Sequence, residues 1–251
     1  MKSADITLKL TVAYDGSAFD GFQVQRGKDI PTIQGAFEDA LRRLYGRDVT
    51  VHPSGRTDKG VHAHAQTISI VVPQSLPYVN LARALNDLLP KAIRVLSVVK
   101  AKDGFNARFS SKKKTYEYLI DDSGAGTVFE RNYIWQVREY LDVAAMKKAA
   151  VHLVGTHEFS TFALRAVKYE TCVRTVFSLT VKRIAKGRIL ITVTADGFLQ
   201  GMVRNIVGAL EEVGRGVRES DALPELLARK DRRAIGFQAP ACGLYLRRVF
   251  Y

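Results

Sequence analysis

Thr-Leu-Lys-Leu-Thr-Val-Ala-Tyr, residues 7–14, carries an apolar or aromatic side chain at every second position. In an extended chain the even-numbered residues, from Leu8 to Tyr14, lie on one face, and the residues between them lie on the other. The segment is therefore predicted to be a strand with one buried face. A strand of this kind needs helices or a second sheet to cover it.

A helix is predicted directly after this strand, over residues 32–45, where apolar side chains recur with the helical period. Thr32 is placed to cap its start, and Gly46 to end it. Strand and helix periods then alternate along the chain. Further strands are predicted at 48–53, 66–72, 93–100, 114–121, 175–184, 188–196 and 244–250, and further helices at 80–89, 142–154, 200–213 and 221–229.

The order strand-helix-strand-strand-helix-strand occurs twice in this series, with the helix at 221–229 inserted before the last strand. This order predicts an α+β fold of two ferredoxin-like (βαββαβ) halves, residues 1–104 and residues 105–251. The halves are expected to form a continuous, mainly antiparallel sheet with helices on one face and a basic active-site cleft between them. The repeat is one of pattern only, because the halves share no visible sequence identity.

The charge of the chain favours a polyanionic partner. Lys and Arg number 38 against 25 Asp and Glu, a formal net charge of +13, and contacts between such side chains and phosphates release counterions. The basic residues are spread along the chain rather than gathered on one amphipathic helix, which argues against a membrane surface. No apolar run approaches the roughly 20 residues that a membrane span needs. The first residues, Met-Lys-Ser-Ala-Asp, do not resemble a signal peptide, so a cytoplasmic location is expected.

Neither a disulfide framework nor a metal site is expected. The two cysteines, Cys172 and Cys242, have no CxxC partner. His52, His62 and His64 form a conceivable set of ligands, but no cysteine or further close ligand accompanies them.

The most unusual segment is Ser-Gly-Arg-Thr-Asp-Lys-Gly-Val-His-Ala, residues 54–63. It joins two predicted strands, yet it is too long and too polar for a tight hairpin. Gly55 and Gly60 would allow sharp turns on either side of Asp58. Functional residues often stand on loops that rigid strands hold in place. The simpler interpretation is an Asx turn, in which Asp58 bonds to its own backbone.

Residues 55–63, Gly-Arg-Thr-Asp-Lys-Gly-Val-His-Ala, resemble the signature loop of the tRNA pseudouridine synthase A family. Other blocks resemble further family segments in the family's order: Tyr-Asp-Gly-Ser-Ala-Phe-Asp-Gly-Phe-Gln at 14–23, Phe-Asn-Ala-Arg-Phe-Ser at 105–110 with Lys-Thr-Tyr-Glu-Tyr at 114–118, Met-Val-Arg-Asn-Ile-Val-Gly at 202–208, and Gly-Leu-Tyr-Leu at 243–246. Residues 234–239 are a looser version of the segment before the last strand. Together the blocks span nearly the whole chain and favour a functional Asp58 over the Asx turn.

The resemblance implies isomerisation of uridine to pseudouridine at positions 38, 39 and 40 in the anticodon stem-loop of tRNA. In this reaction the N1–C1′ bond breaks, and the uracil turns and is rejoined through C5. No cofactor is required, and the chain contains neither a GxGxxG loop nor a Walker motif. The family also works as a homodimer. Asp58 is implied as the catalytic nucleophile, and whether it attacks C1′ or the base, or removes a sugar proton, stays open.

The resemblance also suggests substrate-binding residues. Arg204 is the cation that would offset the desolvation of an ionised Asp58. Tyr116 would stack on the target base or act later as a general base, and packing in the core is the alternative. Arg56 would fill the space that the flipped nucleotide leaves, or hold its phosphate. The remaining candidates are Leu244 and Leu246, as walls around the base, and Arg108, as a further RNA contact.

Three other interpretations stay open. The chain could be an inactive tRNA-binding protein, which needs the same basic surface but no ionised Asp58. It could be a related pseudouridine synthase that acts on other tRNA or RNA positions. It could also be a ferredoxin-like protein that does not bind RNA, in which case no salt-sensitive RNA binding is expected.

Overall fold

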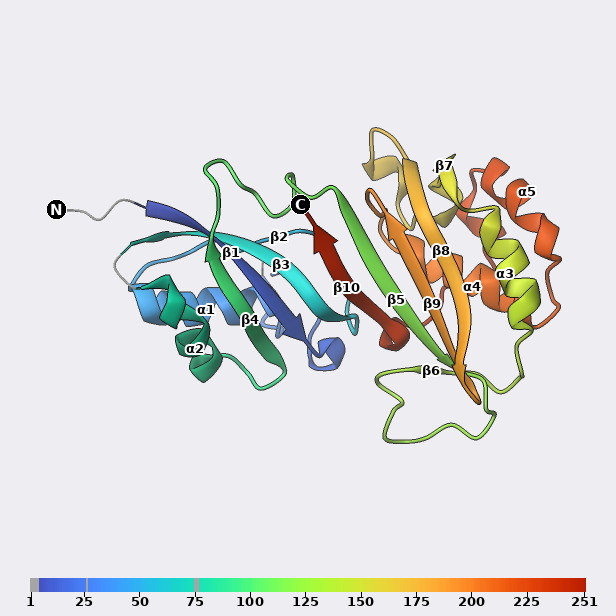
Figure 1. Ribbon diagram of the computed structural model, residues 1–251, viewed down its shortest axis with the longest axis horizontal. Coiled ribbons are helices and arrows are strands. Elements are labelled where there is room, and N and C mark those ends of the chain that lie inside the picture. Colours follow the sequence, from blue (N-terminus) through green and yellow to red (C-terminus); the bar gives the residue numbers. More distant parts are fainter. Residues whose placement is uncertain (1–4, 26, 75–76) are drawn as a thin grey trace. The chain divides into compact units, whose positions relative to one another are not determined.

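The computed structural model describes residues 5–25, 27–74 and 77–251 (Figure 1). The chain divides into two compact units, Met1–Lys112 with Leu246–Tyr251, and Lys113–Tyr245. The sequence pattern placed a boundary after residue 104, so the two divisions differ over residues 105–112 and 246–251. The N-terminal residues 1–4, on which most of the signal-peptide argument rests, lie outside the described residues.

The first unit is a sheet with two helices against one face (Figure 1). Its strands, in sheet order, are β4 (Ile93–Lys100), β1 (Asp5–Tyr14), β3 (His62–Pro73) and β10 (Leu244–Phe250), and the short β2 (His52–Pro53) pairs with β3. β1 runs antiparallel to both of its neighbours, β3 and β4. The helices are α1 (Ile33–Tyr45) and α2 (Tyr78–Leu88).

The second unit is also built of strands and helices. Its strands, in sheet order, are β5 (Lys113–Asp121), β9 (Arg188–Ala195), β8 (Val173–Ala185) and β7 (Gly155–Glu158), and the short β6 (Trp135–Gln136) pairs in parallel with β5. The pairs β5–β9, β8–β9 and β7–β8 are antiparallel. The helices are α3 (Val143–Val151), which packs against β8, α4 (Met202–Gly214) and α5 (Leu223–Ala228).

Single 3-10 turns complete the list of elements. They are η1 (Gly16–Ala18), η2 (Ser160–Phe162), η3 (Ala166–Lys168), η4 (Ser220–Ala222), η5 (Arg232–Ala234) and η6 (Ala241–Gly243). Within the part of the chain that the structure describes, every helix is too short or too polar to cross a lipid bilayer.

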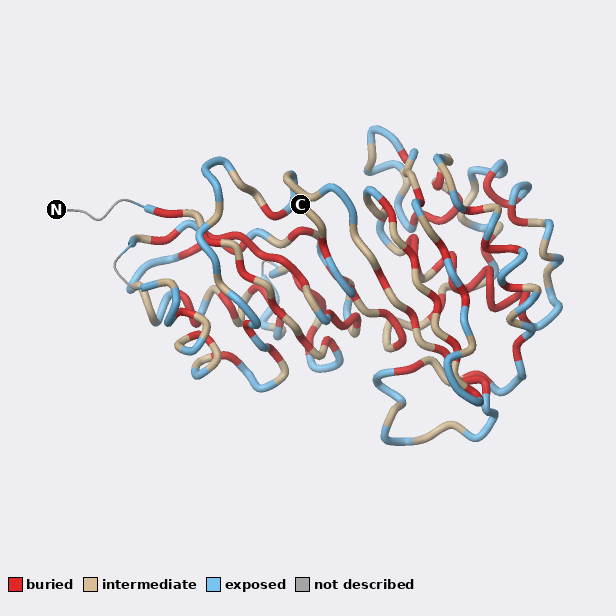
Figure 2. The backbone as a smooth tube through the Cα atoms, viewed as in Figure 1, coloured by how far each residue is buried: buried red, intermediate tan, exposed pale blue. Residues whose placement is uncertain are grey.

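The one-faced character of β1 is confirmed. Its even-numbered residues, from Ile6 to Tyr14, are buried, and the residues between them are half-buried, an alternation visible in Figure 2. The caps of α1 are also confirmed, because Thr32 Oγ1 accepts the Gly35 N–H at 3.1 Å and Gly46 has a φ of +66°. Local sequence therefore sets both the register of this strand and the ends of the helix that follows it.

Several segments differ from the sequence prediction, and two of them show why. The strand expected at 48–53 is reduced to β2. Val49 and Val51 are buried, but Val51 donates its N–H to Glu38 Oε1 of α1 at 3.3 Å rather than to a neighbouring strand. The helix expected at 142–154 ends at Val151, and Gly155, with a φ of +111°, begins the unpredicted β7. The apolar residues of the first segment correctly predicted that it is buried, but they could not predict whether it pairs with another strand.

A buried ion pair ties together three elements of the second unit. Asp122, directly after β5, is fully buried in its side chain and accepts two hydrogen bonds of 2.7 Å from Arg183 of β8. Leu141, just before α3, donates its N–H to Asp122 at 3.0 Å and accepts from Arg183 at 3.0 Å. Burial acts to raise the pKa of Asp122, but the bonds from Arg183 and Leu141 outweigh it and hold that pKa below its usual value.

Replacing Asp122 with Ala should lower the free energy of unfolding by about 3 kcal/mol, because a guanidinium would be left without its buried partner. Denaturant unfolding at neutral pH measures this change. Asp231→Ala is the control, since Asp231 pairs with an Arg233 side chain that is 90% exposed. The control should change stability by less than about 0.5 kcal/mol. Equal effects of the two substitutions would show that the Asp122 pair has no special role.

Candidate active site

The loop predicted between two strands lies between β2 and β3, and it carries Asp58. Asp58 is half-buried, Arg56 is exposed, and Thr57 between them is buried. Val61 donates its N–H to the Asp58 carbonyl at 3.2 Å, and Gly60, with a φ of +78°, allows the turn that this bond closes. The loop thus turns the Thr57 side chain into the protein, leaves Arg56 at the surface and half-buries Asp58.

Buried side chains hold the arm of this loop that precedes Asp58. Tyr14, the last residue of β1, shares a hydrogen bond of 2.8 Å between its hydroxyl and that of Thr57. Gln66 of β3 donates to the Gly55 carbonyl at 2.8 Å and accepts from the Ser54 hydroxyl at 2.6 Å. Tyr14, Thr57, Gln66 and Ser54 are all less than 10% exposed. Because these bonds are shielded from water, the residues that lead into Asp58 have little freedom to move.

Residues 14–23 form a second support for the loop. Phe22 donates its N–H to the Thr57 carbonyl at 3.0 Å, and Gly16 donates its N–H to His62 Nδ1 at 3.1 Å. The two sequence blocks that resemble the family most closely at this end of the chain, 14–23 and 55–63, are therefore one structural piece.

Two glycines allow this contact between backbones. A Cβ added to Gly16 would lie 2.0 Å from the Val61 carbonyl oxygen. A Cβ added to Gly21 would lie 2.9 Å from the Thr57 carbonyl oxygen, and Gly21 also has a φ of +92°. Any larger residue at either position would push the Asp58 loop out of place.

His62 supports this loop from within. It is 2% exposed, and its Nδ1 accepts the Gly16 N–H, so this nitrogen carries no proton in that bond. Asp15 Oδ1 lies 3.2 Å from the same nitrogen. His52 and His64 are exposed. Among the residues that the structure describes, no group of three or more His, Cys, Asp or Glu side chains is placed to hold a metal ion.

Arg204 lies in the second unit, on α4, and is half-buried. Its Nε donates to the Ala239 carbonyl at 2.6 Å, and the Ala239 N–H donates to the Arg204 carbonyl at 3.1 Å. One turn later, a Cβ on Gly208 would lie 2.4 Å from the Phe237 carbonyl oxygen. The loose family segment 234–239 is thus pinned against the stripe of α4 that carries Arg204, and the guanidinium is held by its backbone rather than extended into solvent.

Tyr116 and Tyr118 both point to the buried side of β5, and their surroundings differ. Tyr118 is fully buried, its hydroxyl donates to the Pro240 carbonyl at 2.7 Å, and burial raises its pKa well above the usual value. Tyr116 is 8% exposed and meets the edge of the Phe198 ring, with the centroids 5.0 Å apart. Tyr118 therefore serves the core, and Tyr116 remains the candidate for contact with a base.

Of the other predicted site residues, the two leucines are buried and Arg108 is exposed. Leu244 and Leu246 are both buried, at 6% and 0% exposure. Arg108 is exposed, and its guanidinium carbon lies 5.4 Å from the centre of the Phe109 ring. Gln66 was not predicted. In the sequence it is only an amide side chain within a predicted strand. Such a side chain points into solvent as often as it supports a site.

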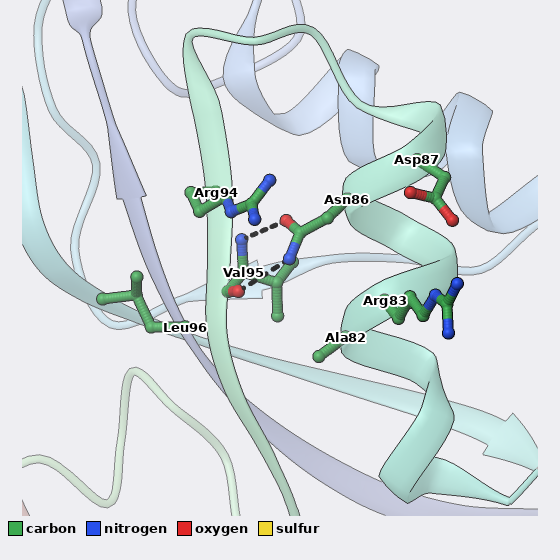
Figure 3. Close-up of a pocket in the computed structure, with 7 residues that line it drawn as sticks. All are labelled: Ala82, Arg83, Asn86, Asp87, Arg94, Val95 and Leu96. Atoms are coloured by element: carbon green, nitrogen blue, oxygen red, sulfur yellow. Dashed lines mark hydrogen bonds between the residues drawn. The ribbon is translucent and has the colours of Figure 1, made fainter.

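A hollow between α2 and β4 is lined by none of the predicted site residues (Figure 3). Asn86 of α2 donates to the Val95 carbonyl at 3.0 Å and accepts the Val95 N–H at 2.8 Å. β4 ends the strand order of its unit, so Asn86 takes up backbone groups that a further strand would otherwise use. The hollow is therefore a protected sheet edge.

Tyr14→Phe should change how stability depends on pH. Burial raises the pKa of Tyr14 to about 12 against the hydrogen bonds from Thr57 and Gln66, whereas an unfolded tyrosine titrates near 10. Between pH 10 and 12 the unfolded chain therefore loses this proton while the folded chain keeps it, and stability falls as pH rises. Wild type should lose about 2–3 kcal/mol more than Tyr14→Phe across this window. Urea unfolding at pH 9 to 12 compares them, and identical pH profiles would contradict the prediction.

Comparison with known proteins identifies the family. A family model described as tRNA pseudouridine synthase matches residues 10–110 and 149–251, which include Asp58 and Arg204 but not Tyr116. The tRNA pseudouridine synthase A of Brevibacillus brevis is 43% identical over 244 residues, 97% of this chain and 99% of that protein. Those of Bacillus subtilis and Geobacillus kaustophilus are 42% and 44% identical over 246 residues, 97% of this chain and 98% and 94% of theirs. The resemblance noted in the sequence is confirmed, and the chain belongs to the tRNA pseudouridine synthase family.

Proposed function

We propose that this chain isomerises uridine to pseudouridine at positions 38, 39 and 40 in the anticodon stem-loop of tRNAs, with Asp58 as the nucleophile. The observation that carries the proposal is the support of the Asp58 loop. Buried hydrogen bonds from Tyr14 and Gln66 fix it to the sheet, and the backbone contacts of Gly16 and Gly21 fix it from the side. A loop with a purely structural role has no need of such support on both sides.

The chemistry needs a carboxylate in a fixed place. The N1–C1′ bond must break, the uracil must turn, and a C5–C1′ bond must form, while C5 loses a proton and N1 gains one. The product has the same atoms as the substrate, so no oxidant, reductant or group donor takes part. A nucleophile accelerates the reaction most when the protein already holds it in the reactive position before the substrate binds. The rigid turn around Asp58 fits that requirement.

The surroundings of Asp58 suit an RNA substrate. Arg56 is exposed two residues away, where it can hold a phosphate or occupy the place of a flipped nucleotide. The net charge of +13 favours such a polyanion.

Four further residues supply the remaining roles in this proposal. Tyr116 contacts the target base, Arg204 provides positive charge for the reaction, and Leu244 and Leu246 wall the base. The backbone contacts that hold Arg204 against Ala239 support its role, because they keep the guanidinium in one orientation. The same proposal includes what the family resemblance implies. The chain forms a homodimer in the cytoplasm, and each chain has a cleft between two ferredoxin-like halves.

Asp58→Asn should abolish pseudouridine formation, by a factor of about a thousand or more, and leave RNA affinity within a few fold. The assay is incubation with an unmodified anticodon stem-loop transcript, followed by position-resolved detection of pseudouridine. Asp48→Asn is the matched control, because Asp48 is an exposed carboxylate of the same unit whose side chain pairs with Arg42. The control should retain full activity.

The same assay separates the alternatives. Equal product from Asp58→Asn and wild type would refute the role of Asp58. Salt-sensitive RNA binding without product from wild type would identify an inactive tRNA-binding protein. Product at other uridines would identify a related synthase, and binding that is absent or insensitive to salt would remove RNA from the function.

A further inference from the structure

We propose that Phe109, with Arg108 beside it, forms a stacking platform for an unpaired nucleotide of the RNA substrate. This inference rests on the proposed function, since it adds a contact for the same substrate. Phe109 is 79% exposed, and the Arg108 guanidinium carbon lies 5.4 Å from the centre of its ring. A single exposed aromatic ring is ordinary on a protein surface, so the argument depends on how the turn that carries this ring is built.

The turn at residues 106–110 is fixed by hydrogen bonds of its own. Asn106 Oδ1 accepts the N–H groups of Arg108 at 2.9 Å and Phe109 at 3.3 Å. Asn106 donates its N–H to the Ser110 hydroxyl at 3.1 Å, and Ser110 donates its N–H to the Asn106 carbonyl at 2.9 Å. Hydrogen bonds with Asn106 and Ser110 therefore restrain the backbone that carries the ring, unlike that of a solvated loop tip.

Ala107 anchors this turn to the sheet of the first unit. It is fully buried, its N–H donates to the Ser69 hydroxyl of β3 at 3.0 Å, and its carbonyl accepts from the Tyr251 hydroxyl at 2.9 Å. Hydrogen bonds thus hold Ala107 in place on both its N–H and its carbonyl, while Arg108 and Phe109, which follow it, lie at the surface.

The strand β3 links the turn to the support of the Asp58 loop, because Ala107 donates its N–H to Ser69 of this strand. Ser54 is the residue that opens the Asp58 loop, and its N–H donates to the Thr67 carbonyl at 2.8 Å. The turn and the loop are therefore attached to the same short stretch of β3, within one unit, and keep a fixed spacing.

A positive charge also lies beside this anchor. Lys9 Nζ lies 4.7 Å from the centre of the Tyr251 ring and 5.8 Å from that of Phe105. The Phe105 and Tyr251 rings have their centroids 5.0 Å apart. Aromatic rings alternating with cations are what proteins present to single-stranded RNA, because bases stack on the rings and phosphates meet the charges.

The chemistry of the platform defines its ligand. An aromatic ring offers a face on which any of the four bases can stack, and it requires a base that is free of its helix. A base pair within a duplex has both faces covered by its neighbours. The ligand is therefore an unpaired loop nucleotide, held at a fixed distance from the Asp58 loop.

The test compares RNA affinity across a range of salt concentrations for wild type and variants of the full chain. Phe109→Ala should weaken binding of an anticodon stem-loop roughly ten-fold and leave the slope of log affinity against log salt unchanged, because no charge is lost. Phe109→Tyr should bind as wild type does. Arg108→Ala should reduce the magnitude of the slope by roughly one contact.

Two controls complete the test. Phe129→Ala removes a ring that is 84% exposed in the segment after β5, and it should leave affinity unchanged. A fully paired RNA duplex should bind Phe109→Ala and wild type equally. Unchanged stem-loop affinity in Phe109→Ala would overturn the platform, and so would an equal loss on the duplex. If wild type forms no pseudouridine while Phe109→Ala still loses stem-loop affinity, the proposed function fails and the platform stands.

Discussion

The hydrogen bond between the buried hydroxyls of Tyr14 and Thr57 connects the register of the sheet to the position of Asp58. Tyr14 ends the alternating buried face of β1, so its direction is set by the same pleat that places Leu8, Leu10 and Val12 in the core. A slip of β1 by one residue would exchange its two faces and turn Tyr14 away from Thr57. The hydrophobic pattern of one strand thus determines where the candidate nucleophile stands.

The contacts around this bond act as a set. Gln66 uses its amide group on Ser54 and on Gly55, and Tyr14 lies 3.5 Å from the same amide nitrogen. Removing any one partner would leave a buried donor or acceptor unsatisfied, which costs more than the bond itself contributes. The arrangement therefore favours a single conformation of the loop. Arg204 is restrained in a different way, because backbone contacts with Ala239 hold it.

Much of the secondary structure followed from local pattern. The strands predicted at 93–100 and 244–250 have those bounds in the structure, because their apolar residues are bounded by clear turn signals. The strand prediction at 48–53 was largely wrong. Val49 and Val51 are buried by packing, and the Val51 N–H bonds to a side chain, which the periodicity of a sequence cannot distinguish from strand pairing. β7 was missed because Gly-Thr-His-Glu has no alternation and becomes a strand only through its pairing with β8.

The site was predictable to a different degree. The loop at 54–63 could be singled out by its length and polarity, and the family resemblance supplied a role for Asp58. The support of that loop could not be predicted, because Gln66 meets Gly55, and Gly16 meets Val61, only once β1 and β3 are paired. Single-residue signals identify groups that can do chemistry. The groups that hold them still depend on contacts between distant parts of the chain.

The first unit is discontinuous, since it consists of Met1–Lys112 and Leu246–Tyr251. During synthesis, the ribosome must add the whole of the second unit before β10 can join β3. Until then the edge of β3 is covered only by the two residues of β2, and the Ala107 carbonyl lacks the hydrogen bond from the Tyr251 hydroxyl. Closing contacts over so large a sequence separation is slow, and an open strand edge invites pairing with other chains. The first unit of a nascent chain therefore stays exposed to aggregation until β10 has been made.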